Sequence, residues 1–394
     1  MISSSAELNG AEGIRRDGAG VRAVVYNDHL AALGGGERST FAYAKALQEL
    51  GYATEVASFR PVPSAETLVA RFGEEFATVP VRTIPREEAQ AYLGARDLAV
   101  FVNHTLMSFL PNPAPLGVYA QMFPTWALRS PEHDAEIRAI ESYQLVLSNS
   151  EFTQRYTRQR WGDAPRRLEV LRPPIGSTTV ESARKFALDP PRKAKQFVHV
   201  GRFNPSLHNK NQLVLIEAFL RAKSQFAVLR DWRLTLLGAL GSTDRDVEYH
   251  ARCLALAEPA RESISIRTNV PESMMNAVLA ESFAYVHATG AFLPPSIAPE
   301  RCEHFGLSIL EGMSHGCLAL VYARGGVWDV AADAPGVHAY LTERELVEGY
   351  AHLATLYDAP VSQQLARDNA ARASVENFTA FKQRLKALLG SVRS

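Results

Sequence analysis

Cysteine is scarce in this sequence, which has three cysteines among its 394 residues and no CxxC pair. An odd number of cysteines at such spacing excludes a disulfide framework and the usual structural zinc site. Long apolar runs are also missing, because no stretch approaches the roughly 18–20 residues of a membrane span and no secretory signal pattern is present. We therefore expect a cytoplasmic protein whose contact with a membrane, where there is any, is peripheral.

Charge of one sign is not in excess either, because 42 Lys and Arg residues balance 42 Asp and Glu residues. Without a global positive field, nucleic-acid binding is not expected, and any phosphate must be bound locally. Hydrophobic residues make up 46% of the chain, which is enough to bury more than one core. At roughly 100–200 residues per domain, the length predicts two domains.

Two hydrophobic periods alternate along most of the chain. Short β-branched runs such as VRAVVYN and DLAVFV are followed by helical stretches such as ERSTFAYAKALQELG. This alternation is typical of βαβ units and predicts two doubly wound, Rossmann-like α/β domains with parallel sheets. The expected order is a disordered tail at 1–20, a first domain at 21–175, a linker at 176–194, a second domain at 195–376 and a terminal helix at 377–394.

Two glutamates, Glu303 and Glu311, flank seven residues at a predicted loop-to-helix junction. Prolines in the preceding loop place the helix start near Phe305. A helical path would separate the two carboxylates by about 12 Å, beyond the roughly 5–9.5 Å of a glycosidase acid–base pair. The separation fits a nucleotide-diphosphate sugar, with the free amides of Phe305, Gly306 and Leu307 seating the diphosphate. The alternative is that Glu303 is an ordinary residue of the first helical turn and Glu311 an ordinary solvated one. The spacing alone does not exclude this.

Two cations and a glycine turn are further candidates for binding phosphate. Arg202 and Lys210 follow the predicted strand QFVHV, where they would neutralise a diphosphate unless they are ordinary surface cations. Gly34, Gly35 and Gly36 lie between the first strand and its helix, and consecutive glycines allow a backbone to approach a ligand closely. A tight turn without a ligand is the alternative, since the GxGxxG spacing is absent.

Several polar residues after predicted strands or turns have two interpretations each. His104 follows DLAVFV, where it would contact a sugar or be structural. Ser150 fits either a site or an N-cap of the next helix. Asp244 and Asp246 form a D-x-D string of the type that holds a metal on a donor diphosphate, but their place after Gly-Ser-Thr favours N-capping. We therefore expect no metal.

Taken together, these segments resemble the retaining glycosyltransferases of family 4, also called group 1, which have the GT-B fold of two Rossmann-like domains around a crevice. The resemblance covers nearly the whole chain from about Val21 onward. It is specific because the sequence motifs occur in the same order as in the family. The motifs are GGGER, NHT, SNSEFTQRY, VLRPP, VGRF with KNQLVLIEAF, and EHFGLSILEGMSHGCLALVYARGGVWD.

The resemblance implies a role for each matching residue. Arg202 and Lys210 would bind the donor diphosphate, Glu303 the donor sugar and Glu311 the ribose, while His104 would lie near the sugar. The glycine turn would close over the phosphates, and the terminal helix would pack back toward the first domain. The segment between Arg202 and Lys210 and the loop from 289 to 302 are longer than is common in the family. With the EHFG string they resemble the eukaryotic lipid-linked-oligosaccharide mannosyltransferases.

The implied activity is transfer of a hexose from a GDP- or UDP-sugar to an acceptor hydroxyl, with retained configuration and without metal or cofactor. Apolar residues around 109–126 would contact a lipid-linked acceptor or belong to the core. Two alternatives remain: a non-catalytic sugar-nucleotide-binding GT-B subunit, and a GT-B epimerase or phosphorylase that uses the same crevice.

Overall fold

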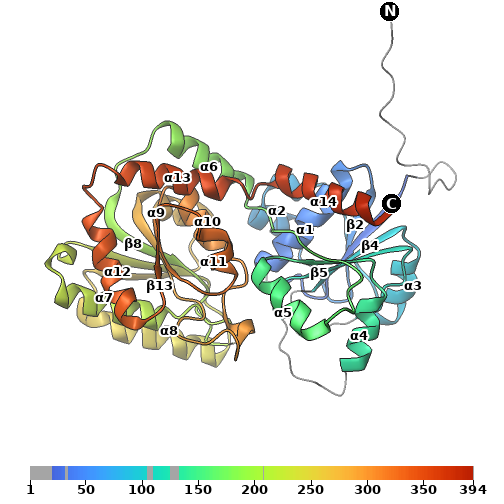
Figure 1. Ribbon diagram of the computed structural model, residues 1–394, viewed down its shortest axis with the longest axis horizontal. Coiled ribbons are helices and arrows are strands. Elements are labelled where there is room, and N and C mark those ends of the chain that lie inside the picture. Colours follow the sequence, from blue (N-terminus) through green and yellow to red (C-terminus); the bar gives the residue numbers. More distant parts are fainter. Residues whose placement is uncertain (1–19, 32–33, 104–109, 125–132, 207, 394) are drawn as a thin grey trace, which may run out of the picture.

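Two parallel sheets, each covered by helices, form the two domains of the protein (Figure 1). The structure is a computed structural model and describes residues 20–31, 34–103, 110–124, 133–206 and 208–393. The expected tail at 1–20 therefore lies outside the described residues, except for its last position. Among the described helices, none combines the length and the apolar character that a membrane span requires.

The first sheet has the order β3-β2-β1-β4-β5-β6-β7, and all of its neighbouring strands are parallel. The central strands β4 and β5 are buried along their whole length, as continuous apolar runs in a doubly covered sheet should be. Its strands are β1 (Arg22–Tyr26), β2 (Ala53–Ser58), β3 (Val81–Thr83), β4 (Leu98–Asn103), β5 (Leu116–Gln121), β6 (Leu145–Ser148) and β7 (Leu168–Val170).

The second sheet has the order β10-β9-β8-β11-β12-β13 and is also parallel throughout. Its strand order reverses between β8 and β11, which makes the carboxyl ends of these two strands the expected place for a ligand. Its strands are β8 (Ala194–Val200), β9 (Arg233–Gly238), β10 (Ile264–Thr268), β11 (Ser282–His287), β12 (Leu318–Tyr322) and β13 (Val337–Tyr340).

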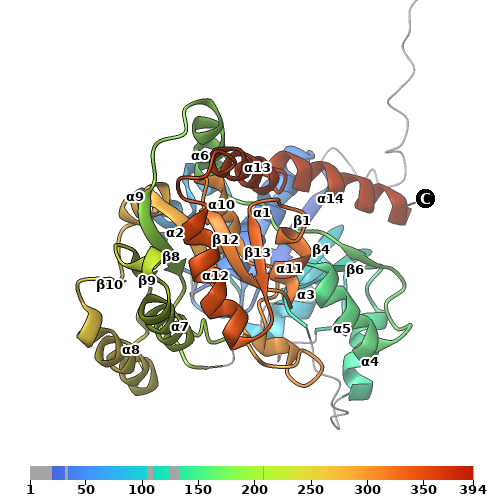
Figure 2. The same cartoon turned by 60° about the vertical axis from the view of Figure 1, so that its left-hand side comes forward.

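Helices cover both faces of each sheet, as the alternating pattern predicts (Figures 1 and 2). With the first sheet are α1 (Gly35–Glu49), α2 (Ala65–Phe72), α3 (Ala89–Gly94), α4 (His133–Glu141), α5 (Glu151–Trp161) and the 3₁₀ turns η1 (Glu74–Phe76) and η2 (Arg86–Glu88). With the second are α6 (Ser177–Leu188), α7 (Gln212–Gln225), α8 (Asp244–Ala257), α9 (Glu272–Glu281), α10 (Leu307–Ser314), α11 (Gly326–Ala331), α12 (Glu343–Thr355), α13 (Ser362–Ser374), η3 (Ala227–Leu229), η4 (Glu258–Ala260) and η5 (Pro299–Arg301).

Each sheet packs against an apolar cluster on both of its faces. In β1, Ala23 and Val25 belong to one cluster and Val24 and Tyr26 to another, because successive side chains of a strand point to opposite faces. In β8, Phe197 belongs to one cluster of the second domain and Val198 to another. The apolar clusters of the two domains are therefore separate, two for each sheet.

Helix α6 occupies most of the segment 176–194 that the sequence analysis assigns to a linker. It lies beside α13 (Figure 2), packs on α13 and α10, and buries Ala183 and Phe186 in the second-domain core. The linker prediction is wrong here, because α6 begins with three β-hydroxy residues and exposes Leu188, which together obscure its helical period. The chain crosses between the domains just before α6, where Ile175 N donates to Glu376 O at 2.7 Å.

The last helix, α14 (Phe378–Arg393), lies on the first domain although α13 before it lies on the second (Figure 1). Phe381 packs edge-on against Tyr43 of α1 with ring centroids 5.1 Å apart, and Leu385 is fully buried in the same cluster. Lys382 Nζ adds an ion pair with Glu49 at 2.6 Å. The end of the chain is thus part of the first-domain core.

Candidate active site

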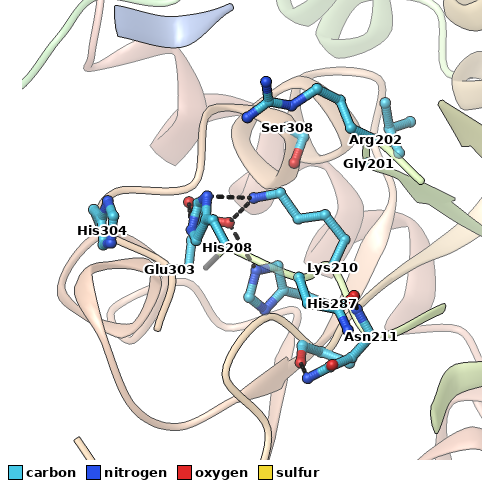
Figure 3. A network of polar contacts seen from close by, with 12 residues as sticks. Gly201, Arg202, His208, Lys210, Asn211, His287, Glu303, His304 and Ser308 are labelled. Atoms are coloured by element: carbon cyan, nitrogen blue, oxygen red, sulfur yellow. Dashed lines mark hydrogen bonds and ion pairs between the residues drawn. The ribbon is translucent and has the colours of Figure 1, made fainter. Parts of the chain in front are cut away.

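Glu303 is the centre of a network of charged and polar side chains in the second domain (Figure 3). It follows η5 and is 7% exposed. Its Oε2 accepts a hydrogen bond from Lys210 Nζ at 2.6 Å, and His287 Nε2 lies 3.4 Å from the same oxygen. On the other side, His208 Nε2 lies 3.5 Å from Oε1. The structure therefore brings together Glu303 and Lys210, which are 93 residues apart in sequence.

The switch point of the second sheet positions these side chains. His287 is the last residue of β11, while Lys210 lies just before α7. Gly201 makes room for the lysine, since a Cβ there would lie 2.7 Å from Lys210 Cγ. The next residue, Asn211, has a left-handed φ of 55°, and its Nδ2 donates to Ala288 O at 2.8 Å. This bond ties the start of α7 to the end of β11 and fixes the lysine against Glu303.

The charges of the network keep Glu303 ionised. Burial by itself raises the pKa of Glu303, but Lys210, His208 and His287 together outweigh this effect and hold the pKa well below its usual range. Burial also lowers the pKa of His287, against the pull of its contact with Glu303. At neutral pH the site therefore contains a carboxylate and an ammonium ion beside a neutral imidazole.

His208 and His304 form a stacked pair next to Glu303. Their ring centroids are 4.5 Å apart and their planes differ by 12°. Burial lowers the pKa of His304 to about 4 and that of His208 well below its usual value. Both rings are therefore neutral at pH 7, which allows two imidazoles to stack without charge repulsion. His304 Nε2 also lies 3.0 Å from Glu300 O.

Helix α10 begins beside this network at Leu307, two residues after Phe305 and thus near the predicted start. Gly306 is its N-cap and has a φ of 99°, a backbone conformation that glycine adopts without strain. The Tyr285 hydroxyl lies 2.9 Å from Ser308 Oγ and 3.0 Å from Val200 O, which joins the first turn of α10 to the end of β8. The first amides of α10, which have no partner within the helix, thus open beside the end of β8.

The glycine turn of the first domain meets α10 across the domain interface. A Cβ added at Gly35 would lie 3.1 Å from Leu307 Cδ1. Gly34 N donates to Glu37 Oε2 at 2.9 Å, so the carboxylate of the first turn holds the start of α1. Gly36 follows in the same turn of α1. The close approach at Gly35 leaves little space for any larger side chain at the interface.

The remaining predicted residues differ in how well the structure places them. Arg202 is exposed, and its guanidinium makes no ion pair with the residues that the structure describes. Glu311 is half-buried on α10. The side chain of Phe305 belongs to the second-domain core, so only its backbone is available to a ligand. His104 lies outside the described residues. Within 110–124, Tyr119 is fully buried and belongs to the first-domain core.

Two predictions about N-caps are settled by the structure. Thr243 caps α8 and forms a capping box with Asp246, so the N-cap interpretation of the D-x-D string is confirmed. Ser150 Oγ accepts from Thr153 N at 3.1 Å and is the N-cap of α5. Among the described residues, no group of three or more His, Cys, Asp or Glu side chains is arranged to hold a metal ion.

The sequence analysis missed His208 and His287. His287 had a detectable signal, because it is a polar residue at the carboxyl end of the otherwise apolar strand SFAYVH. His208 had none, since its segment has no regular period and its place is set by the contact with Glu303.

Part of the second domain matches a known family. Residues 181–358 match the family model described as glycosyl transferases group 1, which agrees with the group 1 part of the resemblance. A GDP-Man:Man(3)GlcNAc(2)-PP-Dol alpha-1,2-mannosyltransferase of Neurospora crassa is 22% identical over 257 residues, and that of Mus musculus 25% over 247. Each match covers 60% of this chain, but only 44% and 45% of the relatives, so the chain spans less than half the length of either.

Solved structures share the arrangement of both domains. A glycosyltransferase from Rickettsia africae has a TM-score of 0.69 at 14% identity and covers 94% of this chain and 98% of its own. Anabaena HepE in complex with UDP and glucose has a TM-score of 0.65 at 16% identity, with 94% and 100% covered. WaaG, involved in lipopolysaccharide biosynthesis, has a TM-score of 0.63 at 14% identity, with 93% and 99% covered. The predicted GT-B fold is confirmed.

Proposed function

We propose that this chain, which matches the group 1 glycosyl transferase model over residues 181–358, is a retaining, metal-independent glycosyltransferase that moves a hexose from a nucleotide-diphosphate sugar to an acceptor hydroxyl. One observation carries the proposal. The Lys210 ammonium, the Glu303 carboxylate and the N-terminus of α10 meet where the second domain faces the glycine turn. A sugar needs hydrogen-bond acceptors and a diphosphate needs positive charge, and this place offers both.

The donor diphosphate is assigned to the cations and the helix terminus. Lys210 Nζ carries three N–H donors. One is directed to Glu303 Oε2, and the Nζ atom also lies 3.5 Å from His208 Nδ1. Arg202, at the end of β8, has no competing ion pair with a described residue and can turn toward the phosphates. Together with the amides at the start of α10, these groups stabilise the negative charge that develops on the leaving phosphate.

The donor sugar is assigned to Glu303. Its pKa is held well below its usual range, so it stays an acceptor-only carboxylate and takes hydrogen bonds from sugar hydroxyls. Glu311, further along α10, is assigned to the ribose. In this mechanism the acceptor attacks from the side of the leaving group, and the departing phosphate takes the acceptor's proton. The chain's own residues bind, orient and stabilise charge, and no covalent intermediate forms on the protein.

The relatives suggest which substrates to try first. The two curated relatives are named as enzymes that use GDP-mannose and a dolichol-linked acceptor, and HepE has been solved with UDP and glucose. We propose a GDP- or UDP-hexose as the donor, with GDP-mannose and UDP-glucose as the leading pair. A lipid-linked oligosaccharide is the proposed acceptor class.

Thermal unfolding in the presence of EDTA tests donor binding. GDP, UDP, ADP and their hexose conjugates are added in turn, and a ligand at 100 times its dissociation constant should raise the midpoint by about 5–10 °C. Arg202→Met should reduce the shift, whereas Arg252→Met on exposed α8 should leave it unchanged. Failure of every nucleotide to shift the wild-type midpoint would overturn the proposal, as would a shift that requires a divalent metal.

Product analysis tests the reaction itself. The donor that binds is incubated with lipid-linked oligosaccharide acceptors, and proton NMR of the product reports its anomeric configuration. The expected result is a product with retained anomeric configuration. Glu303→Gln should lose the transfer activity. Binding without transfer to any acceptor would instead identify a non-catalytic subunit. Conversion of the donor in the absence of an acceptor would identify an epimerase.

A further inference from the structure

The residue after Glu303 is held by both domains. Ser150 Oγ, at the N-terminus of α5 in the first domain, donates a hydrogen bond to His304 O at 2.6 Å across 154 residues of sequence. Phe123, also of the first domain, places its ring centroid 5.7 Å from that of His304. On the second-domain side, the His304 ring stacks on His208, and its Nε2 lies 3.0 Å from Glu300 O. The imidazole is therefore enclosed between the two domains.

The peptide that joins Glu303 to His304 is fixed by its surroundings on the second-domain side as well. Gly326 N, at the start of α11, donates to Glu303 O at 2.6 Å. A Cβ at Gly326 would lie 1.7 Å from His304 O and 2.9 Å from Ser150 Oγ, so no side chain fits there. Two consecutive carbonyls are thus held, one by the second domain and one by the first. The hydrogen bond from Ser150 to His304 O exists only while the domains are in contact.

The N-terminus of α5 makes one more bond across the interface. Asp329 Oδ2 of α11 accepts from Phe152 N, so the second domain caps a helix of the first. Ser150 Oγ accepts from Thr153 N in the same turn while it donates to His304. The serine hydroxyl uses its lone pair for its own helix and its proton for the other domain. Its side chain is therefore hydrogen-bonded both to its own helix and to the loop of Glu303.

We propose that Ser150 and Phe123 are positioning residues for Glu303, and that they act through His304 when the two domains close. This inference rests on the proposed function, in which Glu303 binds the transferred sugar. A misplacement of about 1 Å in such a group costs about 100-fold in rate. Contact between the domains thereby completes the sugar site, which couples closure of the crevice to the readiness of Glu303.

A matched pair of variants separates the donor role of Ser150 from its capping role. Asn and Asp both cap helices well and are nearly equal in volume, but only Asn can donate a hydrogen bond to His304 O. Ser150→Asp should therefore lower kcat by about 10- to 100-fold relative to Ser150→Asn. The KM for the nucleotide sugar should stay within about threefold, because the diphosphate contacts are intact. Phe123→Leu, which introduces no charge, should lower kcat in the same way.

Ser64→Ala is the control for loss of a helix cap. Ser64 caps α2 in the same domain, accepting from Thr67 N at 3.2 Å, and makes no hydrogen bond to the described residues of the second domain. It should lower the thermal midpoint but leave kcat unchanged. Equal kcat values for Ser150→Asp and Ser150→Asn would overturn the inference. So would an effect confined to KM, which would make Ser150 a determinant of binding instead.

Hydrogen exchange keeps the inference testable if the wild-type protein turns over no nucleotide sugar, an outcome that refutes the proposed function alone. In the unliganded protein, peptides spanning 303–312 and the amide of Gly326 should exchange faster in Ser150→Asp and Phe123→Leu than in Ser150→Asn or Ser64→Ala. Equal exchange in all four variants would show that the first domain does not hold the Glu303 loop.

Discussion

Replacing Lys210 with methionine removes the ammonium from Glu303 and keeps most of the side-chain volume. The pair is buried, with side-chain exposures of 15% for the lysine and 9% for the glutamate. Removing one partner of a buried ion pair costs about 3–5 kcal/mol, because the other charge is left without compensation. In a domain of this size, this loss corresponds to a midpoint lower by about 10 °C for the second-domain transition.

An exposed ion pair of the same length is the control. Arg221 Nη1 and Glu343 Oε1 are also 2.6 Å apart, but their side chains are 57% and 51% exposed. Arg221→Met should cost no more than about 1 kcal/mol, since solvent screens both charges. Differential scanning calorimetry of the two variants compares a buried and an exposed pair at equal distance.

A second substitution decides whether the buried charge is the cause. Adding Glu303→Gln to Lys210→Met removes the uncompensated carboxylate, so the double variant should regain most of the lost stability while remaining inactive. A double variant no more stable than Lys210→Met would refute the reasoning. So would equal losses in Lys210→Met and Arg221→Met.

Three further outcomes follow from particular contacts. Gly35→Val places a side chain against Leu307, so the rise of the thermal midpoint with GDP or UDP should fall by about half or more. An undiminished rise would contradict a role for this contact in donor binding. Burial lowers the pKa of His199 to about 3, so the unfolded chain takes up this proton first and stability falls as the pH drops from 6.5 toward 3, by on the order of 4 kcal/mol. His199→Gln should flatten that dependence in pH-resolved urea unfolding, and parallel curves would exclude His199 as its source. Leu385→Ala should cost about 2–5 kcal/mol in the first-domain transition only, and a shift of the second-domain transition would contradict the packing of α14 on the first domain.

The two parallel sheets could be predicted because their strands have strong local signals. Buried parallel strands are continuous apolar runs, and the helices between them require right-handed crossovers, which leaves few arrangements. Helix α6 could not be predicted in the same way, because few apolar side chains anchor it to the core, among them Ala183 and Phe186, and Leu188 is exposed. It packs on α13, a helix that follows it far along the chain and that the local sequence does not reveal.

The candidate site was predictable only in part, for a related reason. Glu303 and Lys210 lie in short motifs, so each could be recognised from its neighbours in sequence. The local sequence around Ser150 indicates a helix cap, and the structure has that cap, but its hydroxyl proton is used 154 residues away. A side chain with two hydrogen-bonding functions satisfies the local pattern with one of them, and only the tertiary structure reveals the other.

The Lys210–Glu303 pair also bears on how a donor would enter. In the unliganded site the ammonium compensates the carboxylate, and His287 adds a polar contact to the same oxygen. A diphosphate that draws the lysine toward itself weakens that compensation, and Glu303 is too buried for water to replace it. Sugar hydroxyls that donate to Glu303 restore the balance. The proposed site therefore favours a nucleotide that carries a sugar over the bare nucleotide, because only the former satisfies both members of the pair at once.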